Sequence, residues 1–128
     1  MKKKHFQILN SNTNSNLHWW FYGRSLWINK ILDKVLNKKN YKILEIGCGS
    51  GVNFDSLSEY GKVVGIEPNK YICKKNSKGN ILNENIEQHS IKNKYDIICM
   101  FDVLEHIKKD NEIINKIYKN HLKKRGFL

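Results

Sequence analysis

The chain has 128 residues and a formal charge of +11, and 40% of its residues are hydrophobic, which allows one domain with one modest core. It contains no run of the roughly 18 to 20 apolar residues that a membrane-spanning helix needs, and its start, MKKKHFQIL, lacks the apolar segment of a signal peptide. The three cysteines, Cys48, Cys73 and Cys99, form no CxxC pair. We therefore expect free thiols in a reducing, cytoplasmic compartment and no metal site.

The excess of positive charge has two interpretations. A net charge of +11 suits a nucleic-acid or acidic-membrane partner. The lysines are scattered, however, along a chain that is also rich in Asn and Ile, and arginine, the better fork for phosphate, is scarce. Compositional bias is the favoured explanation, and a nucleic-acid partner stays open without being favoured.

The first predicted element is a helix that follows an irregular N-terminal segment. Residues 1–17 are expected to be a flexible lead-in, because 10–16 read NSNTNSN, a polar stretch of low complexity. The aromatic stretch HWWFYGR follows at 18–24. Ser25 suits the N-cap of a helix with one apolar face, formed by Ile28, Ile31, Leu32, Val35 and Leu36.

The middle of the chain predicts strands that alternate with helices. ILEI at 43–46 reads as a buried strand, and the glycine-rich residues 47–51 follow it as a loop. A helix is predicted from this loop to Gly61, with Val52, Phe54, Leu57 and Tyr60 as its apolar positions. A second strand over 63–66 ends at Glu67 and Pro68, and residues 69–75 are expected to be helical.

The last third of the chain continues this alternation. A short strand is predicted at 81–82, and YDIICMF at 95–101 reads as a buried strand. A second amphipathic helix is marked by Ile113, Ile114, Ile117, Tyr118 and Leu122, and GFL at 126–128 reads as the opening of another strand. Alternating strands and helices predict an α/β fold, a Rossmann-like three-layer α/β/α sandwich with a mainly parallel sheet.

Three glycines, at 47, 49 and 51, directly follow the first predicted strand. Glycine costs backbone entropy, so such a loop needs positive φ or close approach to the main chain. In parallel α/β sheets, ligands bind beyond the carboxyl ends of the strands, where the next helix offers free N–H groups. Glu67, 20 residues after Gly47, ends the second strand, and a carboxylate there can accept hydrogen bonds from both hydroxyls of a ribose. Together these features predict a ligand of the adenosine type.

A specific pattern narrows the choice of ligand. The dinucleotide pattern G-x-G-x-x-G would need glycine at 52, where this chain has Val52. Instead, E-x-G-x-G-x-G at 45–51, with VVGIEPN at 63–69, resembles the class I S-adenosylmethionine-dependent methyltransferases. YDIICMFDVLEHI at 95–107 resembles their fourth-strand segment, HLKKRGFL at 121–128 their segment before strand five, and HWWFYGR an aromatic lead-in of their small-molecule branches. The resemblance covers residues 18–128 as an S-adenosylmethionine-binding domain.

The resemblance implies a set of cofactor-binding residues. Glu45 would orient the ammonium group of the cofactor, Glu67 would hold the ribose hydroxyls, and Asn85 and Ile86 would contact adenine. Each glutamate also has a structural alternative. Glu45 would cap a nearby loop, and Glu67 would be an acidic residue favoured at a helix N-terminus. The aromatic stretch is expected to serve packing, with a lid over the cofactor as the alternative. The full implied set is Glu45, Gly47, Cys48, Gly49, Gly51, Glu67, Pro68, Asn85, Ile86, Phe101 and Asp102.

Methyl transfer from a sulfonium is an in-line displacement that depends on positioning and on exclusion of water. An oxygen acceptor also needs a base, and Glu105 and His106 follow the fourth predicted strand. Imidazole has an ordinary pKa near 6.5, which suits general-base work near neutrality. The alternatives are a structural role for both residues at the start of the next helix, or a metal-binding role for Glu105 of the kind that the resemblance implies.

The implied fold continues through strands five, six and seven, so we expect this chain to be the cofactor-binding part, incomplete after strands 1–4 and the start of strand 5. On its own it is expected to be a poor catalyst or inactive. Three functions are weighed. The first is methyl transfer from S-adenosylmethionine to a small-molecule acceptor. The second is an RNA or protein methyltransferase, although no N-P-P-[YF] motif follows strand four. The third is a non-catalytic module that keeps the cofactor fold.

Overall fold

A computed structural model of the protein describes residues 15–37, 40–73, 75–88 and 92–128. The chain divides into two compact units, Met1–Val35 and Leu36–Leu128. The flexible lead-in predicted for 1–17 falls largely outside the described residues. Its last three positions, 15–17, belong to a helix.

The described part of the first unit is one helix, α2 (Ser15–Val35). It begins well before Ser25, which was wrongly expected to cap it, and it includes the aromatic stretch. The Arg24 guanidinium lies 5.6 Å from the centroid of the Trp20 ring one turn earlier, a cation–π contact that supports the helix there. The Ser25 hydroxyl donates to the Tyr22 carbonyl at 2.8 Å, a bond that serines inside helices form.

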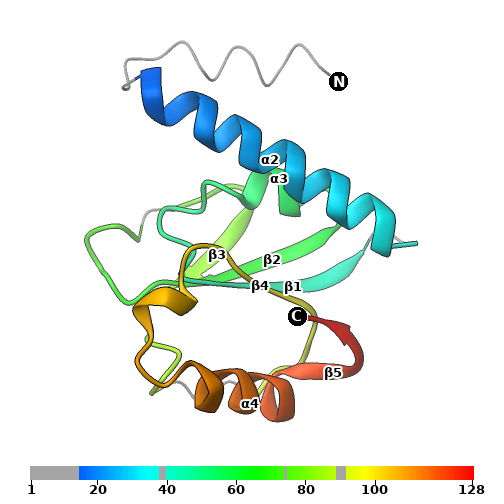
Figure 1. The fold of residues 1–128 in the computed structure, drawn as a ribbon, viewed down its shortest axis with the longest axis vertical. Coiled ribbons are helices and arrows are strands. Elements are labelled where there is room, and N and C mark those ends of the chain that lie inside the picture. Colours follow the sequence, from blue (N-terminus) through cyan, green and yellow to red (C-terminus); the bar gives the residue numbers. More distant parts are fainter. Residues whose placement is uncertain (1–14, 38–39, 74, 89–91) are drawn as a thin grey trace. The chain divides into compact units, whose positions relative to one another are not determined.

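The second unit is built on one parallel five-stranded sheet in the order β3-β2-β1-β4-β5 (Figure 1). Both neighbours of β1 pair with it in register, Ile43 lying opposite Val63 on β2 and Ile97 on β4. This arrangement confirms the predicted α/β class with a parallel sheet. The strands are β1 (Tyr41–Ile46), β2 (Gly61–Ile66), β3 (Gly79–Leu82), β4 (Tyr95–Met100) and β5 (Leu122–Phe127).

Helices cover the sheet on both faces (Figure 1). On one face, Ile113 and Ile117 of α4 (Asp110–Asn120) pack into a buried cluster with residues such as Leu44 and Ile66. On the other face, Phe54 of α3 (Phe54–Leu57) is fully buried. A Cβ on Gly65 or Gly79 would lie 2.7 Å from the Phe54 ring. Glycine on β2 and β3 therefore lets this aromatic side chain sit directly on the strands.

The helix predicted over 69–75 is wrong, because its described residues form only a single turn, in which the Ile72 and Cys73 N–H groups donate to the Asn69 carbonyl at 3.0 and 3.3 Å. The Asn69 Oδ1 accepts from the Tyr71 N–H at 3.0 Å, and the Asn76 Oδ1 accepts from the Lys78 N–H at 2.8 Å. Bonds of this i, i+2 kind close local turns. The described residues between β2 and β3 are accordingly turns and an isolated bridge between Asn76 and Gly79.

Several element boundaries also differ from the prediction, and those near Gly61 and Leu122 differ most. Gly61 begins β2 and does not end a helix, since α3 stops at Leu57 and turns follow it. Leu122 belongs to β5, which begins there and not at Gly126. The reason is a backbone bond at the end of α4, where the Tyr95 N–H donates to the His121 carbonyl at 2.7 Å. That bond brings the following residues alongside β4.

The Asp96 carboxylate fastens three strands at the end opposite the glycine loop. Its Oδ2 accepts from the Lys42 backbone N–H on β1, and its Oδ1 accepts from the Lys123 Nζ on β5, both at 2.8 Å. Burial by itself would raise the pKa of Asp96, but these two hydrogen bonds and the lysine charges outweigh it. The net effect lowers the pKa below its ordinary 3.8.

Replacing this carboxylate gives a pH-dependent test of the sheet. We expect Asp96→Asn to lower the free energy of unfolding by roughly 1 kcal/mol near pH 7. Because the folded-state pKa is depressed, the difference should be complete above pH 3.8 and disappear as the pH falls through the folded value. Urea unfolding of both proteins across this range measures it. A difference that stays constant in acid would contradict the assignment.

Candidate functional site

A cavity of about 310 Å³ lies beyond the carboxyl ends of the strands, beside the point where the strand order reverses between β1 and β4. In doubly wound sheets this is the usual position of a ligand. Its lining combines an apolar floor with carboxylates, an amide and an imidazole. The lining residues are Ile46, Gly47, Ile66, Glu67, Pro68, Asn85, Ile86, Glu87, Asp102, Val103, His106 and Ile107.

This cavity brings together seven of the thirteen residues predicted from the sequence, taken from four separate loops: Gly47, Glu67, Pro68, Asn85, Ile86, Asp102 and His106. The other six lie outside its lining, and four of them belong to the glycine loop or to β1: Glu45, Cys48, Gly49, Gly51, Phe101 and Glu105.

The glycine loop adopts left-handed backbone at all three glycines, with φ of +69° at Gly47, +56° at Gly49 and +80° at Gly51. Other residues reach this region only at a cost. Other atoms also approach the main chain of this loop closely, as expected, but they belong to the protein and not to a ligand. A Cβ at Gly47 would lie 2.5 Å from the Val103 side chain, and one at Gly51 would lie 2.6 Å from the Asn76 amide. Of the three glycines, Gly47 alone lines the cavity.

The Glu67 carboxylate connects the end of β2 to the glycine loop. Its Oε2 accepts from the Gly49 N–H at 3.0 Å, and its Oε1 accepts from the Asn69 N–H at 2.9 Å. The residue is only 9% exposed, yet it lines the cavity. An ionised carboxylate has about four acceptor positions. Two backbone donors therefore hold this side chain in place and leave capacity for further donors.

Glu45 has a structural contact deeper in the sheet. Its Oε1 accepts from the Asn53 Nδ2 at 2.6 Å, and the residue is 1% exposed. Asn53 ends the glycine loop at the start of α3. The pair therefore fixes the far end of the loop to β1, which agrees with the loop-capping alternative weighed for Glu45.

The turn after β3 forms one wall of the cavity. Ile86 is buried, and the Asn85 Oδ1 accepts from the Glu87 N–H at 2.9 Å. Lys116 of α4 reaches across to donate to the carbonyls of Ile86 and Glu87, at 3.0 and 3.1 Å. Helix α4 thus holds this wall through one ammonium group. The sequence contains no local signal for the contact of Lys116, because thirty residues separate the ends of the hydrogen bond.

The segment after β4 supplies the opposite wall. Asp102 has φ of +54°, a conformation that non-glycine residues rarely take and that often marks functional loops. Glu105 and His106 lie in the short 3₁₀ helix η1 (Leu104–His106). His106 faces both this cavity and a neighbouring one of about 520 Å³, which Lys108, Lys109 and Glu112 also line. Val103 and Ile107, which sequence reasoning missed, supply apolar contact beside it.

Two of the three cysteines, the buried Cys48 and the half-buried Cys99, have raised pKa values. Burial, followed by the charges of Glu45 and Glu67, raises the pKa of Cys48 to about 12. Burial, with a smaller effect of Glu45, raises the pKa of Cys99 to about 12 as well. Since the thiolate is the reactive form, these raised pKa values disfavour a nucleophilic role for either thiol near neutral pH. Within the described residues, no group of three His, Cys, Asp or Glu side chains is placed to hold a metal ion.

Comparison with known proteins places this arrangement in a family. A family model described as a methyltransferase domain matches residues 17–128. The chain belongs to this family. Among curated relatives, the ubiquinone biosynthesis O-methyltransferase of Glaesserella parasuis serovar 5 is 33% identical over 113 residues, which is 77% of this chain and 48% of that protein. The protein of the same name from Vibrio atlanticus is 28% identical over 105 residues, 73% of this chain and 44% of its own length.

Solved structures agree on the fold of this methyltransferase-family chain. The plantazolicin methyltransferase BpumL in complex with SAH superposes with a TM-score of 0.69 at 20% identity, covering 95% of this chain and 49% of that one. The glycopeptide N-methyltransferase MtfA complexed with S-adenosylmethionine gives 0.64 at 12% identity, covering 80% and 51%. The chain thus spans about half the length of the relatives it matches. Among the described residues, no helix is long and apolar enough to cross a bilayer.

Two glycine substitutions separate backbone strain from crowding. Gly49→Ala meets nothing closer than the Ile72 side chain at 3.8 Å, so we expect only the cost of positive φ, roughly 1 kcal/mol. Gly47→Ala adds a clash with Val103 in the cavity wall and should cost at least about 2 kcal/mol. Urea unfolding measures both. Equal losses would show that the close approach of Val103 carries no weight.

Proposed function

We propose that the whole protein transfers a methyl group from S-adenosylmethionine to an oxygen atom of a small molecule, and that this chain supplies the cofactor-binding part. The family membership and the printed names of the curated relatives, O-methyltransferases, support the reaction type. Neighbours solved with SAH or S-adenosylmethionine support the cofactor. The observation that carries the proposal is the Glu67 carboxylate, buried, held by two backbone donors and lining the cavity.

The cavity residues fit a nucleoside chemically. Glu67 retains acceptor positions for ribose hydroxyls, because each of its oxygens has one recorded donor. Ile86 and Ile107 offer apolar surface to an adenine ring, and the Asn85 Oδ1 has a second lone pair for its amino group. Asp102 stands on the opposite wall with an acidic side chain, where it can accept from the ammonium group of a bound cofactor. In this assignment Glu45 supports the loop and does not touch the ligand.

The remaining chemistry belongs to the acceptor. Bound S-adenosylmethionine supplies a methyl group that its sulfonium already activates. The residues of this chain therefore position the acceptor, exclude water and accept one proton. His106 lies between the cofactor cavity and the neighbouring cavity lined by Lys108 and Lys109. Neutral imidazole can take a proton from an acceptor hydroxyl that occupies the second cavity. The Lys108 ammonium beside it favours the oxyanion that results, whereas Lys109 is paired with Glu112 at 3.2 Å.

Cofactor binding is tested by titrating the chain with S-adenosylhomocysteine in a calorimeter. Glu67→Gln replaces one acceptor oxygen by an amide donor beside the Gly49 N–H, so we expect affinity to fall by about tenfold or more. Glu59→Gln, outside the cavity lining, is the matched control and should bind as the parent does. If the parent chain does not bind the ligand, or both variants bind equally well, the assignment of Glu67 fails.

Methyl transfer is tested with radiolabelled S-adenosylmethionine and small phenols, whose ordinary pKa near 10 puts proton removal within reach of an imidazole. In a form of the protein that turns over, we expect His106→Gln to lower kcat by roughly 10²-fold and to remove the acidic limb of its pH profile, while the affinity for S-adenosylhomocysteine stays close to the parent value. Unchanged kcat with an unchanged profile would exclude His106 as the base. Cofactor binding without transfer to any acceptor would favour a non-catalytic module.

A further inference from the structure

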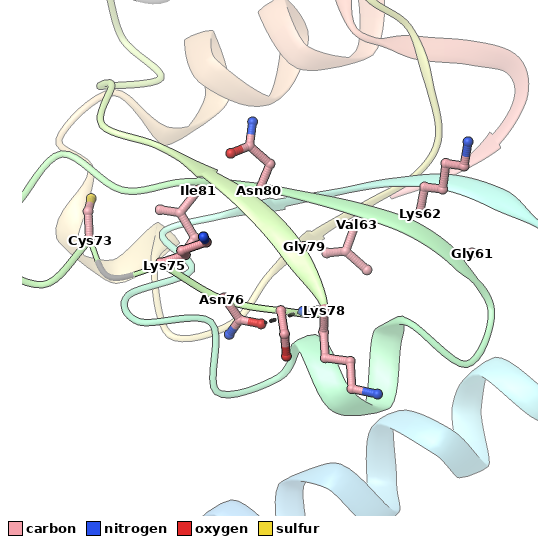
Figure 2. A pocket seen from close by; sticks show the side chains of 11 residues that line it. Gly61, Lys62, Val63, Cys73, Lys75, Asn76, Lys78, Gly79, Asn80 and Ile81 are labelled. Carbon is pink, nitrogen blue, oxygen red and sulfur yellow. Dashed lines mark hydrogen bonds between the residues drawn. The ribbon is translucent and has the colours of Figure 1, made fainter.

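The lysines of this chain differ in what their ammonium groups contact. A cavity of about 650 Å³ over β2 and β3 is lined by three lysines, but Figure 2 shows Lys62 and Lys78 pointing away from each other. Their ammonium groups therefore define no common ligand position. Lys116 of α4 is the opposite case, because its Nζ donates to two consecutive carbonyls, of Ile86 at 3.0 Å and of Glu87 at 3.1 Å. It is an ammonium group fixed against one wall of the cofactor cavity.

The wall that Lys116 contacts is a turn closed by its own hydrogen bonds. The Asn85 Oδ1 accepts from the Glu87 N–H at 2.9 Å, and the Asn85 carbonyl accepts from the Gln88 N–H at 3.1 Å. These bonds fix the shape of the turn, but they do not fix its direction relative to the sheet. The two bonds from Lys116 join the turn to α4, and hydrogen bonds from a charged donor belong to the stronger class.

Helix α4 also contacts this wall through apolar side chains. Ile113 and Ile117 belong to the same buried cluster as Ile86. Lys116 is half-buried and lies on the turn of the helix after Ile113, at the flank of its buried face. Apolar packing is non-directional, whereas a hydrogen bond depends on the direction of the carbonyl. Lys116 therefore contributes what the packing of Ile86 lacks, a fixed orientation of the backbone of the turn.

The orientation of this turn concerns two cavities. Asn85, Ile86 and Glu87 line the cofactor cavity, and Glu87 also lines the neighbouring cavity beside His106. Lys116 lines neither cavity, so it acts on a ligand only through the wall. Without its two bonds, the Asn85 Oδ1 that we assign to the amino group of adenine loses its fixed direction.

We propose that Lys116 is a positioning residue for the cofactor. By holding the carbonyls of Ile86 and Glu87 it aims the Asn85 amide at the adenine amino group, and it thereby sets the preference of the cavity for adenine over a purine that lacks this group. A site built to hydrogen-bond a polar group of its ligand discriminates against an analogue without it. The inference rests on the proposed cofactor site and adds a residue from outside its lining.

Calorimetric titration of the 128-residue chain with two ligands tests this role. S-adenosylhomocysteine carries adenine, and S-inosylhomocysteine carries an oxygen in place of the adenine amino group. The parent should bind the first about tenfold more tightly than the second. Lys116→Met keeps the apolar stem and removes the ammonium group. It should lose about fivefold or more in affinity for S-adenosylhomocysteine but change by less than about twofold for S-inosylhomocysteine.

Three further variants serve as controls, and circular dichroism confirms that each one folds. Lys119→Met removes the same charge from an exposed position of α4 outside both cavity linings, so it should bind both ligands as the parent does. Lys116→Arg keeps a charged donor group that can reach two carbonyls, and it should restore both the affinity, to within about threefold, and the preference. Lys116→Ala, which suits a helix, should behave as Lys116→Met does.

A second measurement needs no ligand. In the parent, the amide protons of Glu87 and Gln88 bond to Asn85 within the turn. Release of the turn from α4 should let it open more often, so these two protons should exchange with water faster in Lys116→Met than in Lys119→Met. Equal exchange in the two variants would show that Lys116 does not hold the wall.

The outcomes separate this inference from the proposed function. Equal binding of S-adenosylhomocysteine by the parent and Lys116→Met would overturn the role of Lys116 and leave the cofactor site intact. An equal proportional loss for the two ligands would reduce Lys116 to a general structural residue, and a parent without preference between them would leave it nothing to set. Failure of the folded parent to bind S-adenosylhomocysteine would overturn the proposed cofactor site and this inference together.

Discussion

The contact between the Glu67 carboxylate and the Gly49 N–H determines how this unit presents its cavity. It joins the residue that follows β2 to the loop that follows β1, at a distance of 3.0 Å. A left-handed backbone at Gly49 leaves its N–H outside the regular bonding of a strand or helix, and a buried N–H needs an acceptor. The carboxylate meets that need, and the same bond fixes the carboxylate. Loop conformation and side-chain position are therefore two results of one interaction.

Much of this arrangement could be predicted from the sequence, because the relevant signals are local. Apolar runs in the sequence located β1, β2 and β4. The spacing from Gly47 to Glu67 identified the carboxyl ends of β1 and β2, which face the cavity. Two of the failures lie where a side chain bonds to the backbone. Ser25 bonds to the preceding turn of its helix, and Asn69 closes a turn where a helix was expected. The hydropathy pattern does not register such bonds.

The sequence predicted the kind of loop at the site, but not the residues that contact it. Glycine at three positions correctly indicated positive φ, but the atoms that crowd Gly47 and Gly51 belong to Val103 and Asn76, which lie far along the chain. The hydrogen bonds from Lys116 to the wall at Ile86 and Glu87 are equally remote. Long-range partners of this kind follow from the packing of α4 against the sheet, and no spacing within the sequence encodes them.

Asparagine side chains hold the loops of this site, so compositional bias alone does not account for them. Asn53 anchors the glycine loop to Glu45, Asn76 braces it from the other side, and Asn83 donates to the carbonyls of Glu67 and Pro68 at 2.9 and 3.0 Å. These amides hold the two loops that flank the cavity without any ligand. A site whose loops are already bonded loses less conformational freedom on binding. The same bonds limit how far the loops can move, so a ligand must fit the cavity largely as the protein presents it.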